Sequence, residues 1–566
     1  MVATRCRPSG TAHECPNPFP SSRRANPCQA DALAHWLARH GIRRLYSLSG
    51  NQIMPIYDAC LDAGLEIVHV RHEGAAVFMA DAAAQIHDRP AIALVTAGPG
   101  FGNALGAMYA ARCSQSPVIL LSGDADDGPG GIGAFQSLDQ CSAAAPFVKA
   151  SWRLDETRSV QQLLALAWNT ACRAPAGPVH VALPANALLR AADSALWPAM
   201  SAEPAPASDD TSRVADLLAA RLAGAMRPVA FAGPALARGL RHDGLGVRLS
   251  SSFGLPLRAA ISPRGLRDPA AGAFADLLGQ SDLIVLLGQP PDFSVGRLRG
   301  TQAELICVHP DPAVLAQSRT MLGSRPATYL QADPRGVVSA MVDGDAARIP
   351  DPATPASAAR TQWSAHLAMA LAHRGLKDDE PAFVAGLRTV AEWLSRLDDP
   401  ILVVDGGEFG QWAQAFVGAP TRLINGPSGG IGGGLPMAIA AGIECPDRQV
   451  VLFSGDGSIG FHLAEFETAA RHDVRPIVIV GNDGAWNAER QIQIRDYGED
   501  RQIACSLSAL AAYDAVARSL GGFGRRVESV GDLLPALEEA RASGRVACLD
   551  WRIAGRAAPA YTPLAG

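Results

Sequence analysis

The chain has 566 residues, of which 48% are hydrophobic and 18% charged, and its formal net charge is −6. This length predicts about three domains. No apolar run reaches the roughly 18 residues that a membrane span requires, and no basic patch predicts a nucleic-acid partner. The 11 cysteines are scattered without C-x-x-C pairs. They predict reduced thiols in a cytoplasmic protein, with no disulfide framework or zinc site.

The N-terminal third predicts a tail followed by an α/β domain. Residues 1–27 are rich in Pro, Ser and Arg, which favours a disordered tail; a transit peptide is the alternative. Residues 28–190 alternate apolar strands with helices, which predicts a parallel sheet covered by helices on both faces. The expected strands are 44–48, 66–70, 91–96, 118–122 and 178–184, and the expected helices include 29–41, 54–63 and 74–85.

Two further α/β regions follow at 205–345 and 380–556, so the predicted fold class is α/β with three mostly parallel sheets. Residues 190–212 are rich in Ala, Pro, Ser and Asp, and residues 344–380 contain polar and Pro-rich patches, so both are predicted to be linkers. The expected strands are 228–232, 282–287 and 303–309 in the central region and 401–404, 423–424, 450–453, 477–480 and 546–551 in the last one. The last region also carries a helical pattern at 461–472.

The segment Gly455-Asp456-Gly457-Ser458-Ile459-Gly460 follows one of these strands. Its spacing matches the G-x-G-x-x-G fingerprint of a dinucleotide site, in which Asp483 would contact a ribose. Asp456, however, lies inside the turn, where its charge would repel a pyrophosphate unless a cation lay between them.

A metal–diphosphate site explains the same residues better. Asp456 and the Asn482 side-chain oxygen are ligands that Mg²⁺ prefers, and the carbonyl of Gly484 could add a third. Backbone N–H groups around Gly457 and Ser458 would hold a phosphate. A dinucleotide site and a βαβ unit without any ligand are the alternatives.

Other candidate motifs lie in both halves of the chain. Glu73 follows a strand at the start of a helix, where the local context alone favours a simple helix N-terminal acid. The glycine-rich turn at 94–103 and the polar loop at 133–140 are weak signals. Residues 426–434 contain six glycines, which would let the backbone approach a ligand while Ile431 projects alone.

Taken together, these segments resemble the thiamine diphosphate-dependent enzymes. The resemblance covers nearly all of residues 30–556 and is greatest to the acetolactate synthase-like group, which also contains benzaldehyde lyase, oxalyl-CoA decarboxylase and 2-hydroxyacyl-CoA lyase. It rests on Gly455-Asp456-Gly457 followed after 24 positions (458–481) by Asn482, on Arg71-His72-Glu73, on Ala97-Gly-Pro-Gly, on Ala134-Phe-Gln, and on the glycine stretch from Gly429 to Pro436.

The resemblance implies a pyrimidine-binding (Pyr) domain at 28–190, a central domain at 205–345 and a diphosphate-binding (PP) domain at 380–556. It implies thiamine diphosphate and Mg²⁺ as cofactors, with Asp456, Asn482 and the Gly484 carbonyl as metal ligands. Glu73 would be the catalytic residue that hydrogen-bonds N1′ of the aminopyrimidine. The remaining cofactor-binding residues would be Gly429, which accepts a hydrogen bond from the aminopyrimidine, Ile431, which bends the cofactor, and Glu408, Phe409, Gly455, Gly457 and Ser458 around the diphosphate.

The activity that the resemblance implies is that of a carboligase or decarboxylase acting on a 2-oxo acid. The alternatives are a 2-hydroxyacyl-CoA or oxalyl-CoA type lyase and a non-catalytic cofactor-binding homologue. Glu73 would reach a cofactor held by the other subunit of a homodimer or homotetramer. No clear flavin fingerprint marks the central region, so FAD is not favoured. Ser137 stands where acetolactate synthases usually carry glutamate, and the candidate substrate-facing residues are Asn51, Phe135, Gln136 and Trp486.

Overall fold

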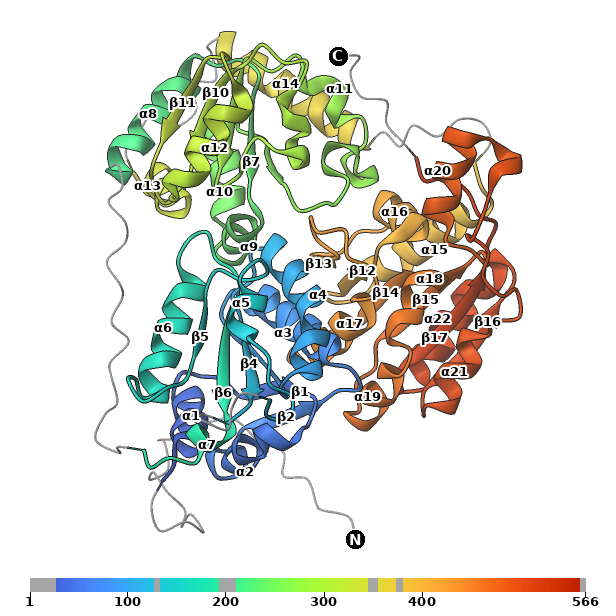
Figure 1. The fold of residues 1–566 in the computed structure, drawn as a ribbon. Helices are drawn as coiled ribbons and strands as arrows, with labels where there is room; N and C mark the ends of the chain where they lie inside the picture. Colours follow the sequence, from blue (N-terminus) through green and yellow to red (C-terminus); the bar gives the residue numbers. More distant parts are fainter. Residues whose placement is uncertain (1–26, 127–132, 193–209, 345–354, 373–379, 560–566) are drawn as a thin grey trace.

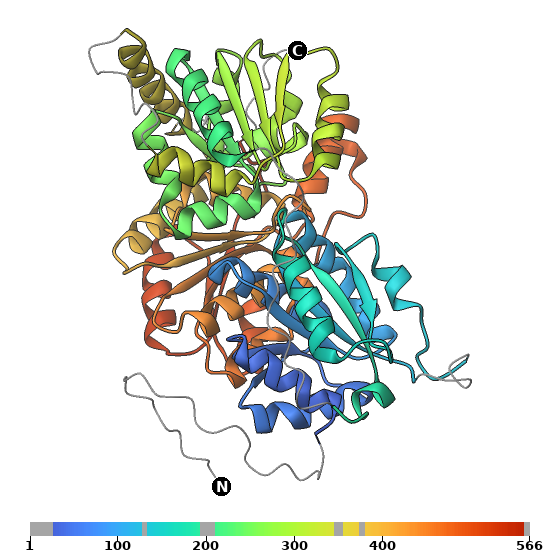
Figure 2. The same cartoon turned by 90° about the vertical axis from the view of Figure 1, so that its left-hand side faces the viewer.

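The computed structural model describes residues 27–126, 133–192, 210–344, 355–372 and 380–559, which form three α/β domains (Figure 1). Each domain contains one parallel sheet with helices packed on it, which confirms the predicted fold class. None of the helices in these ranges is long and apolar enough to cross a membrane. The view in Figure 2 shows the central domain above the other two.

The first sheet has six strands in the order β2-β1-β3-β4-β6-β5. The strands are β1 (Arg44–Ser47), β2 (Glu66–His69), β3 (Ala91–Val95), β4 (Val118–Asp124), β5 (Ser151–Arg153) and β6 (Val179–Pro184). Its main helices are α1 (Gln29–Arg39), α2 (Met54–Ala63), α3 (Glu73–His87), α4 (Pro99–Cys113) and α6 (Val160–Cys172), with the short helices η1 (Asn51–Ile53), α5 (Gln140–Ala144) and α7 (Ala185–Leu188).

The central sheet has five strands in the order β11-β10-β9-β7-β8. They are β7 (Pro228–Ala232), β8 (Leu257–Ala259), β9 (Leu283–Leu287), β10 (Glu304–Val308) and β11 (Ala327–Leu330). The main helices are α8 (Thr211–Gly224), α9 (Pro234–His242), α10 (Leu245–Phe253), α12 (Pro312–Leu322), α13 (Pro334–Asp343) and α14 (Pro355–Ala372), joined by η2 (Gly265–Arg267), η3 (Pro269–Ala271), α11 (Phe274–Leu278) and η4 (Phe293–Leu298).

The third sheet has the order β13-β12-β14-β15-β17-β16, which repeats the topology of the first sheet strand for strand. It contains β12 (Ile401–Val404), β13 (Thr421–Ile424), β14 (Val450–Gly455), β15 (Ile477–Asn482), β16 (Phe523–Val527) and β17 (Ala547–Arg552). The helices are α15 (Phe383–Ser395), α16 (Gly407–Phe416), α17 (Gly434–Glu444), α18 (Asp456–Ile459), α19 (Glu465–Arg471), α20 (Asn487–Tyr497), α21 (Tyr513–Ser519) and α22 (Leu533–Ala542), with η5 (Gly460–His462), η6 (Glu499–Arg501) and η7 (Val530–Asp532).

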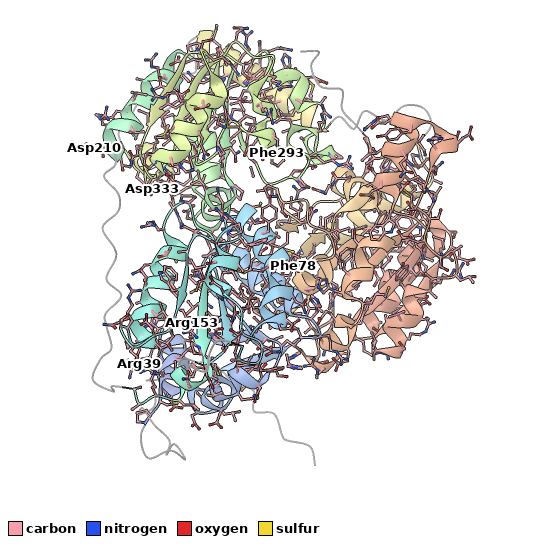
Figure 3. The ribbon with its side chains drawn as sticks, in the orientation of Figure 1. Arg39, Phe78, Arg153, Asp210, Phe293 and Asp333 are labelled. Atoms are coloured by element: carbon pink, nitrogen blue, oxygen red, sulfur yellow. The ribbon has the colours of Figure 1, made fainter. Side chains whose placement is uncertain are left out.

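The first and third domains share one apolar core where α3 packs against α17. Phe78 of α3 lies at this boundary (Figure 3) and contacts the ring of His462 edge-on. Glu444 at the end of α17 accepts hydrogen bonds from Arg44 and Tyr46 of β1 and contacts His87. The two sheets are therefore fixed to each other by both apolar and charged contacts.

Two predictions of local structure were wrong. The predicted linker 344–380 contains the 18-residue helix α14, which packs on the central domain through Trp363 and Leu367. The buried Arg360 of this helix donates to backbone carbonyls of the central domain, including that of Ala225. The helix expected at 461–472 is broken into η5 and α19. The predicted tail at 1–27 lies outside the described residues except for residue 27. Residues 193–209 of the linker predicted at 190–212 also lie outside them, while Thr211 and Ser212 already belong to α8.

Candidate active site

The candidate site is a cavity of about 210 Å³ at the carboxyl ends of β12, β14 and β15. β12 and β14 are neighbours in the sheet, and the connection after β12 runs to β13 on one side while the connection after β14 runs to β15 on the other. This arrangement is the switch point at which open parallel sheets bind ligands. The lining residues come from the central and third domains, among them Arg264, Glu408, Ile431, Asp456, Gly457, Ser458, Asp483 and Trp486.

Asp405, directly after β12, shapes the glycine-rich segment on one side of the cavity. Its buried carboxylate accepts hydrogen bonds from the N–H groups of Gly406, Gly432 and Gly434 at 2.7, 3.0 and 3.1 Å. Burial raises the pKa of Asp405 although these hydrogen bonds favour the carboxylate. No local pattern in the sequence marks Asp405, although its carboxylate fixes the backbone on either side of Ile431.

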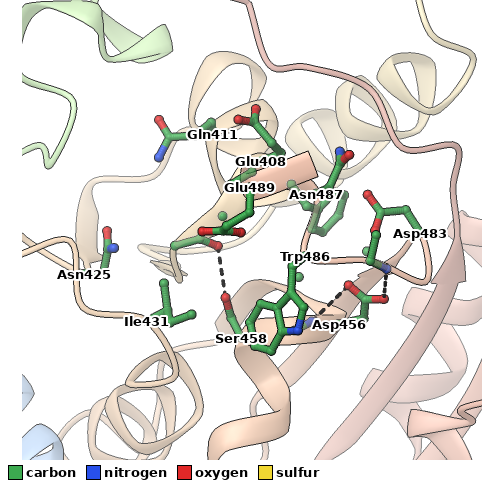
Figure 4. Close-up of a pocket in the computed structure, with 18 of the residues that line it drawn as sticks. Glu408, Gln411, Asn425, Ile431, Asp456, Ser458, Asp483, Trp486, Asn487 and Glu489 are labelled. Atoms are coloured by element: carbon green, nitrogen blue, oxygen red, sulfur yellow. Dashed lines mark hydrogen bonds between the residues drawn. The ribbon is translucent and has the colours of Figure 1, made fainter. Parts of the chain in front are cut away.

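Ile431 and Gly429 lie in the cavity wall, where the sequence predicted them. Gly429 has φ +66°, a conformation in which a side chain would be strained. A Cβ on Gly406 would come within 2.4 Å of the Ile431 side chain, so the glycine at 406 gives Ile431 its place. In Figure 4, Ile431 and Asn425 lie on one side of the cavity, while Asp456 and Asp483 lie on the other.

The Gly455–Ser458 turn lies where strand β14 passes into α18. Asp456 accepts hydrogen bonds from the N–H groups of Gly457 at 2.9 Å and Ala485 at 3.2 Å. Ser458 donates its hydroxyl to the carbonyl of Gly406 at 3.3 Å, one of the dashed lines in Figure 4. The turn is thereby bonded both to the loop after β12 and to the loop after β15.

Trp486 covers this turn with its indole ring. A Cβ on Gly457 would lie 2.6 Å from the ring, so only glycine fits beneath it. The predicted substrate-facing residue Trp486 thus packs directly on the predicted diphosphate turn and also lines the cavity.

Two neighbouring carboxylates, Asp456 and Asp483, give the site its charge. Burial raises the pKa of Asp456 to about 6. Burial and the nearby Asp456 raise the pKa of Asp483 to about 7. Burial raises the pKa of both carboxylates, and Asp456 adds to the rise at Asp483, so a cation would stabilise this pair.

Asn482 supplies a second observation that fits a metal. Its Nδ2 donates to Asp550 at 2.8 Å, which fixes the orientation of the amide. Within the described part of the chain, Asn482 Oδ1 and Asp483 Oδ1 are buried atoms without a hydrogen-bond partner. An unpartnered buried amide oxygen is a group that a hard cation such as Mg²⁺ would satisfy. The predicted ligands Asn482 and Gly484 are themselves not among the residues that line the cavity. The carbonyl of Gly484 already accepts the N–H of Leu507 at 2.7 Å, so one of its two lone pairs is engaged.

The predicted residues of the first domain lie elsewhere. Glu73 begins α3, is 8% exposed and accepts a hydrogen bond from Asn103 at 3.0 Å. Gln136 accepts a hydrogen bond from Gln52 at 2.8 Å, and Phe135 beside it is 79% exposed. No residue of the described ranges 27–126 and 133–192 lines the cavity. A single chain therefore does not bring Glu73, Phe135, Gln136 or Asn51 to the Asp456 cavity.

The sequence also missed polar residues that line the cavity. Gln411, which is 2% exposed, and Asn425 each have a side-chain oxygen without a hydrogen-bond partner in the described structure. Arg264 reaches the cavity from the central domain and pairs with Glu408 at 2.7 Å. Only their positions in the fold identify them, since no local pattern distinguishes them from surface residues.

Two segments of the chain match known domain families. Residues 29–143 match the N-terminal TPP binding domain of thiamine pyrophosphate enzymes, and residues 405–551 match the C-terminal TPP binding domain. A probable acetolactate synthase of Mycobacterium bovis is 31% identical over 531 residues, which cover 90% of this chain and 93% of the relative. The chain belongs to the thiamine pyrophosphate enzyme family.

Other members of this family are similar over comparable lengths. A human 2-hydroxyacyl-CoA lyase 2 is 30% identical over 543 residues, covering 87% of this chain and 84% of the relative. The acetolactate synthase isozyme 1 large subunit of Escherichia coli is 28% identical over 496 residues, covering 82% and 83%. The chain is accordingly a thiamine pyrophosphate enzyme of the type that forms or cleaves carbon–carbon bonds, and it is acetolactate synthase-like, as the sequence predicted.

Proposed function

We propose that this thiamine pyrophosphate enzyme is a Mg²⁺-dependent carboligase or decarboxylase that acts on a 2-oxo acid. The observation that carries the proposal is the cavity at the β12/β14 switch point, which Asp456, Asp483 and the Gly455–Ser458 turn line, together with the unpartnered buried oxygen of Asn482 at the end of β15. A metal–diphosphate fits these groups, because the oxygens would bind the cation and the turn's N–H groups would face a phosphate.

In this proposal Asp456 and Asn482 hold Mg²⁺, and the second lone pair of the Gly484 carbonyl is available to it. Gly457, Ser458 and the Glu408–Phe409 turn surround the diphosphate. The Gly429 carbonyl accepts a hydrogen bond from the aminopyrimidine. When bound, thiamine diphosphate supplies an acidic carbon whose deprotonated form adds to carbonyl groups.

The protein's own contribution is positioning and proton control. Ile431, held between Gly406 and the glycine segment that Asp405 fixes, supports the cofactor in a bent form. Glu73 would exchange a proton with N1′ of the aminopyrimidine. Because Glu73 does not line the cavity of its own chain, we propose a homodimer in which Glu73 of the partner subunit serves this cavity, with Asn51, Phe135 and Gln136 near the substrate.

A second candidate function is cleavage of a 2-hydroxyacyl-CoA. It is supported by the 30% identity to the human 2-hydroxyacyl-CoA lyase 2. The two functions differ in the substrate's leaving group and in whether coenzyme A is part of the substrate.

The test is to load the purified protein with thiamine diphosphate and Mg²⁺ and to screen 2-oxo acids and 2-hydroxyacyl-CoA esters. We expect release of carbon dioxide from at least one 2-oxo acid, and its loss in Asp456→Asn. Aldehyde release from a 2-hydroxyacyl-CoA ester, with no turnover of 2-oxo acids, would select the second candidate. A wild-type protein that binds no thiamine diphosphate would contradict both.

A further inference from the structure

The central domain reaches the cofactor cavity through the short segment between β8 and η2. Pro263 and Arg264 of this segment both line the cavity, and Pro263 lies 3.7 Å from where a Cβ on Gly429 would be. Arg264 Nη2 donates to Glu408 Oε1 at 2.7 Å. This segment lies outside the two matched domains at 29–143 and 405–551, so the family comparison gives Arg264 no role.

Glu408 is the second residue of α16 and is only 8% exposed. Its second oxygen, Oε2, accepts the N–H of Ala558 at 2.6 Å. An acid in the first turn of a helix is favourable by itself. Here, however, the same helix start lies in the wall of a cavity proposed to hold a diphosphate, and a buried carboxylate would repel that anion.

The charges that line the cavity show how unusual Arg264 is. Its lining contains four acidic residues but only one lysine or arginine, which is Arg264. The acids are Glu408, Asp456, Asp483 and the exposed Glu489. Asp456 and Asp483 lie side by side where a cation would neutralise them, whereas Glu408 lies apart from them (Figure 4). Arg264 therefore neutralises the buried acid that the proposed metal leaves uncompensated.

We propose that Arg264 is a positioning residue for the cofactor: its charge cancels that of Glu408 beside the diphosphate, so that the central domain contributes to cofactor affinity. Arg264 acts through Glu408 and contacts no reacting atom. This inference rests on the proposed function, because it needs thiamine diphosphate in this cavity.

The test measures the thiamine diphosphate Kd of the full-length cofactor-free protein at saturating Mg²⁺, by calorimetry. Arg264→Met keeps most of the side-chain length but removes the charge, and we expect its Kd to rise on the order of tenfold or more. Glu408→Gln should bind at least as tightly as the wild type. The double variant Arg264→Met/Glu408→Gln should regain a Kd within about threefold of the wild type.

The control is Arg267→Met, which removes an exposed arginine three residues away and should leave the Kd unchanged. The rescue separates charge compensation from a structural role, because a role in packing would not be restored by removing the charge of Glu408. An unchanged Kd in Arg264→Met, or a double variant as weak as Arg264→Met, would overturn the inference alone. A wild-type protein without thiamine diphosphate affinity would overturn the proposed function together with it.

Discussion

The substitution Asp405→Asn tests how the glycine segment around Ile431 is held. Oδ1 of Asp405 accepts the N–H groups of Gly406 and Gly432, and Oδ2 accepts the N–H of Gly434 and the hydroxyl of Ser454. Asparagine keeps one acceptor oxygen and places an NH₂ group where the other was. If the oxygen stays with Gly406 and Gly432, the buried N–H of Gly434 loses its acceptor and faces a donor.

The cost of that lost hydrogen bond sets the size of the expected effect. A buried donor left without its acceptor costs about 1–3 kcal/mol. If this cost is incurred when the segment orders around the cofactor, it weakens thiamine diphosphate binding by about 5- to 150-fold. Any part of this free-energy cost that is already present in the cofactor-free protein will lower the thermal midpoint of that protein and will not weaken binding.

Calorimetry with thiamine diphosphate and Mg²⁺ measures the change in Kd. A thermal melt of the cofactor-free protein measures the loss of stability. The matched control is Asp447→Asn, which makes the same change at an exposed position of the same domain. We expect the control to behave as the wild type. If Asp405→Asn also binds and melts as the wild type does, the carboxylate does not hold the glycine segment and the reasoning is refuted.

Four further predictions concern the cofactor and the domain contact. Glu73→Gln should slow deuterium exchange at the thiazolium C2 of bound cofactor by about 10²- to 10⁴-fold with little change in Kd, and normal exchange measured by NMR would exclude its proposed role. Gly457→Ala should weaken cofactor binding by roughly tenfold or more, because the added methyl group would lie 2.6 Å from the Trp486 ring; an unchanged Kd in calorimetry would contradict this packing. Removing divalent cations with EDTA should weaken cofactor binding by about 10²-fold or more, because the negative charge of Asp456 would then face the diphosphate without a cation between them. Adding Mg²⁺ should restore the binding. Binding that is insensitive to EDTA in the same calorimetric titration would argue against a metal. Burial would raise the pKa of Glu444, but its hydrogen bonds with His87, Tyr46 and Arg44 and the charge of Arg44 outweigh burial and hold this pKa at about 2, below the ordinary 4.5. The carboxylate therefore contributes stability above pH 4.5, on the order of 3 kcal/mol, and loses that contribution as the pH falls toward 2. Glu444→Gln should lower the free energy of unfolding at pH 7 in denaturant titrations, with a deficit that shrinks below pH 4.5, and a deficit independent of pH would count against the ion pairs.

The strands of the fold could be predicted from the sequence because their signal is local. Strands β7 and β12 begin and end at the predicted residues, since both are short apolar runs buried on both faces. The helix predicted at 461–472 is broken, and the packing of its second part could not be predicted from local pattern. Glu465 and Thr468 are buried there, Thr468 donates to Glu465, and Glu465 accepts the N–H of Arg71 from the first domain.

The linker predicted at 344–380 failed in a similar way. The segment contains polar and Pro-rich patches, yet α14 packs on the central domain through Trp363 and Leu367, and its Arg360 donates to backbone carbonyls there. The identical strand order of the first and third sheets could not be predicted from the sequence either, because two sheets can share a topology without a sequence repeat. The packing of α14 and of Glu465 depends on contacts between segments more than a hundred residues apart.

The candidate site also contains residues that local sequence patterns predict and residues that they do not. The turn at Asp456 and the glycine segment around Ile431 carry a local spacing, and the structure brings them together in one cavity. Asp405, Gln411 and Arg264 carry no such spacing, because their importance comes from hydrogen bonds and burial that only the folded chain creates.

The most direct test of the account is a heterodimer of two complementary variants, Glu73→Gln and Asp456→Asn, purified by two different affinity tags. Deuterium exchange at the thiazolium C2 is the readout, because it needs no knowledge of the substrate. If Glu73 of one subunit serves the Asp456 cavity of the other, the heterodimer has one intact site and should show about half of the wild-type exchange per dimer. Each homodimeric variant should show almost none. A heterodimer as inactive as the two homodimers would contradict the proposal that the active site is shared between subunits.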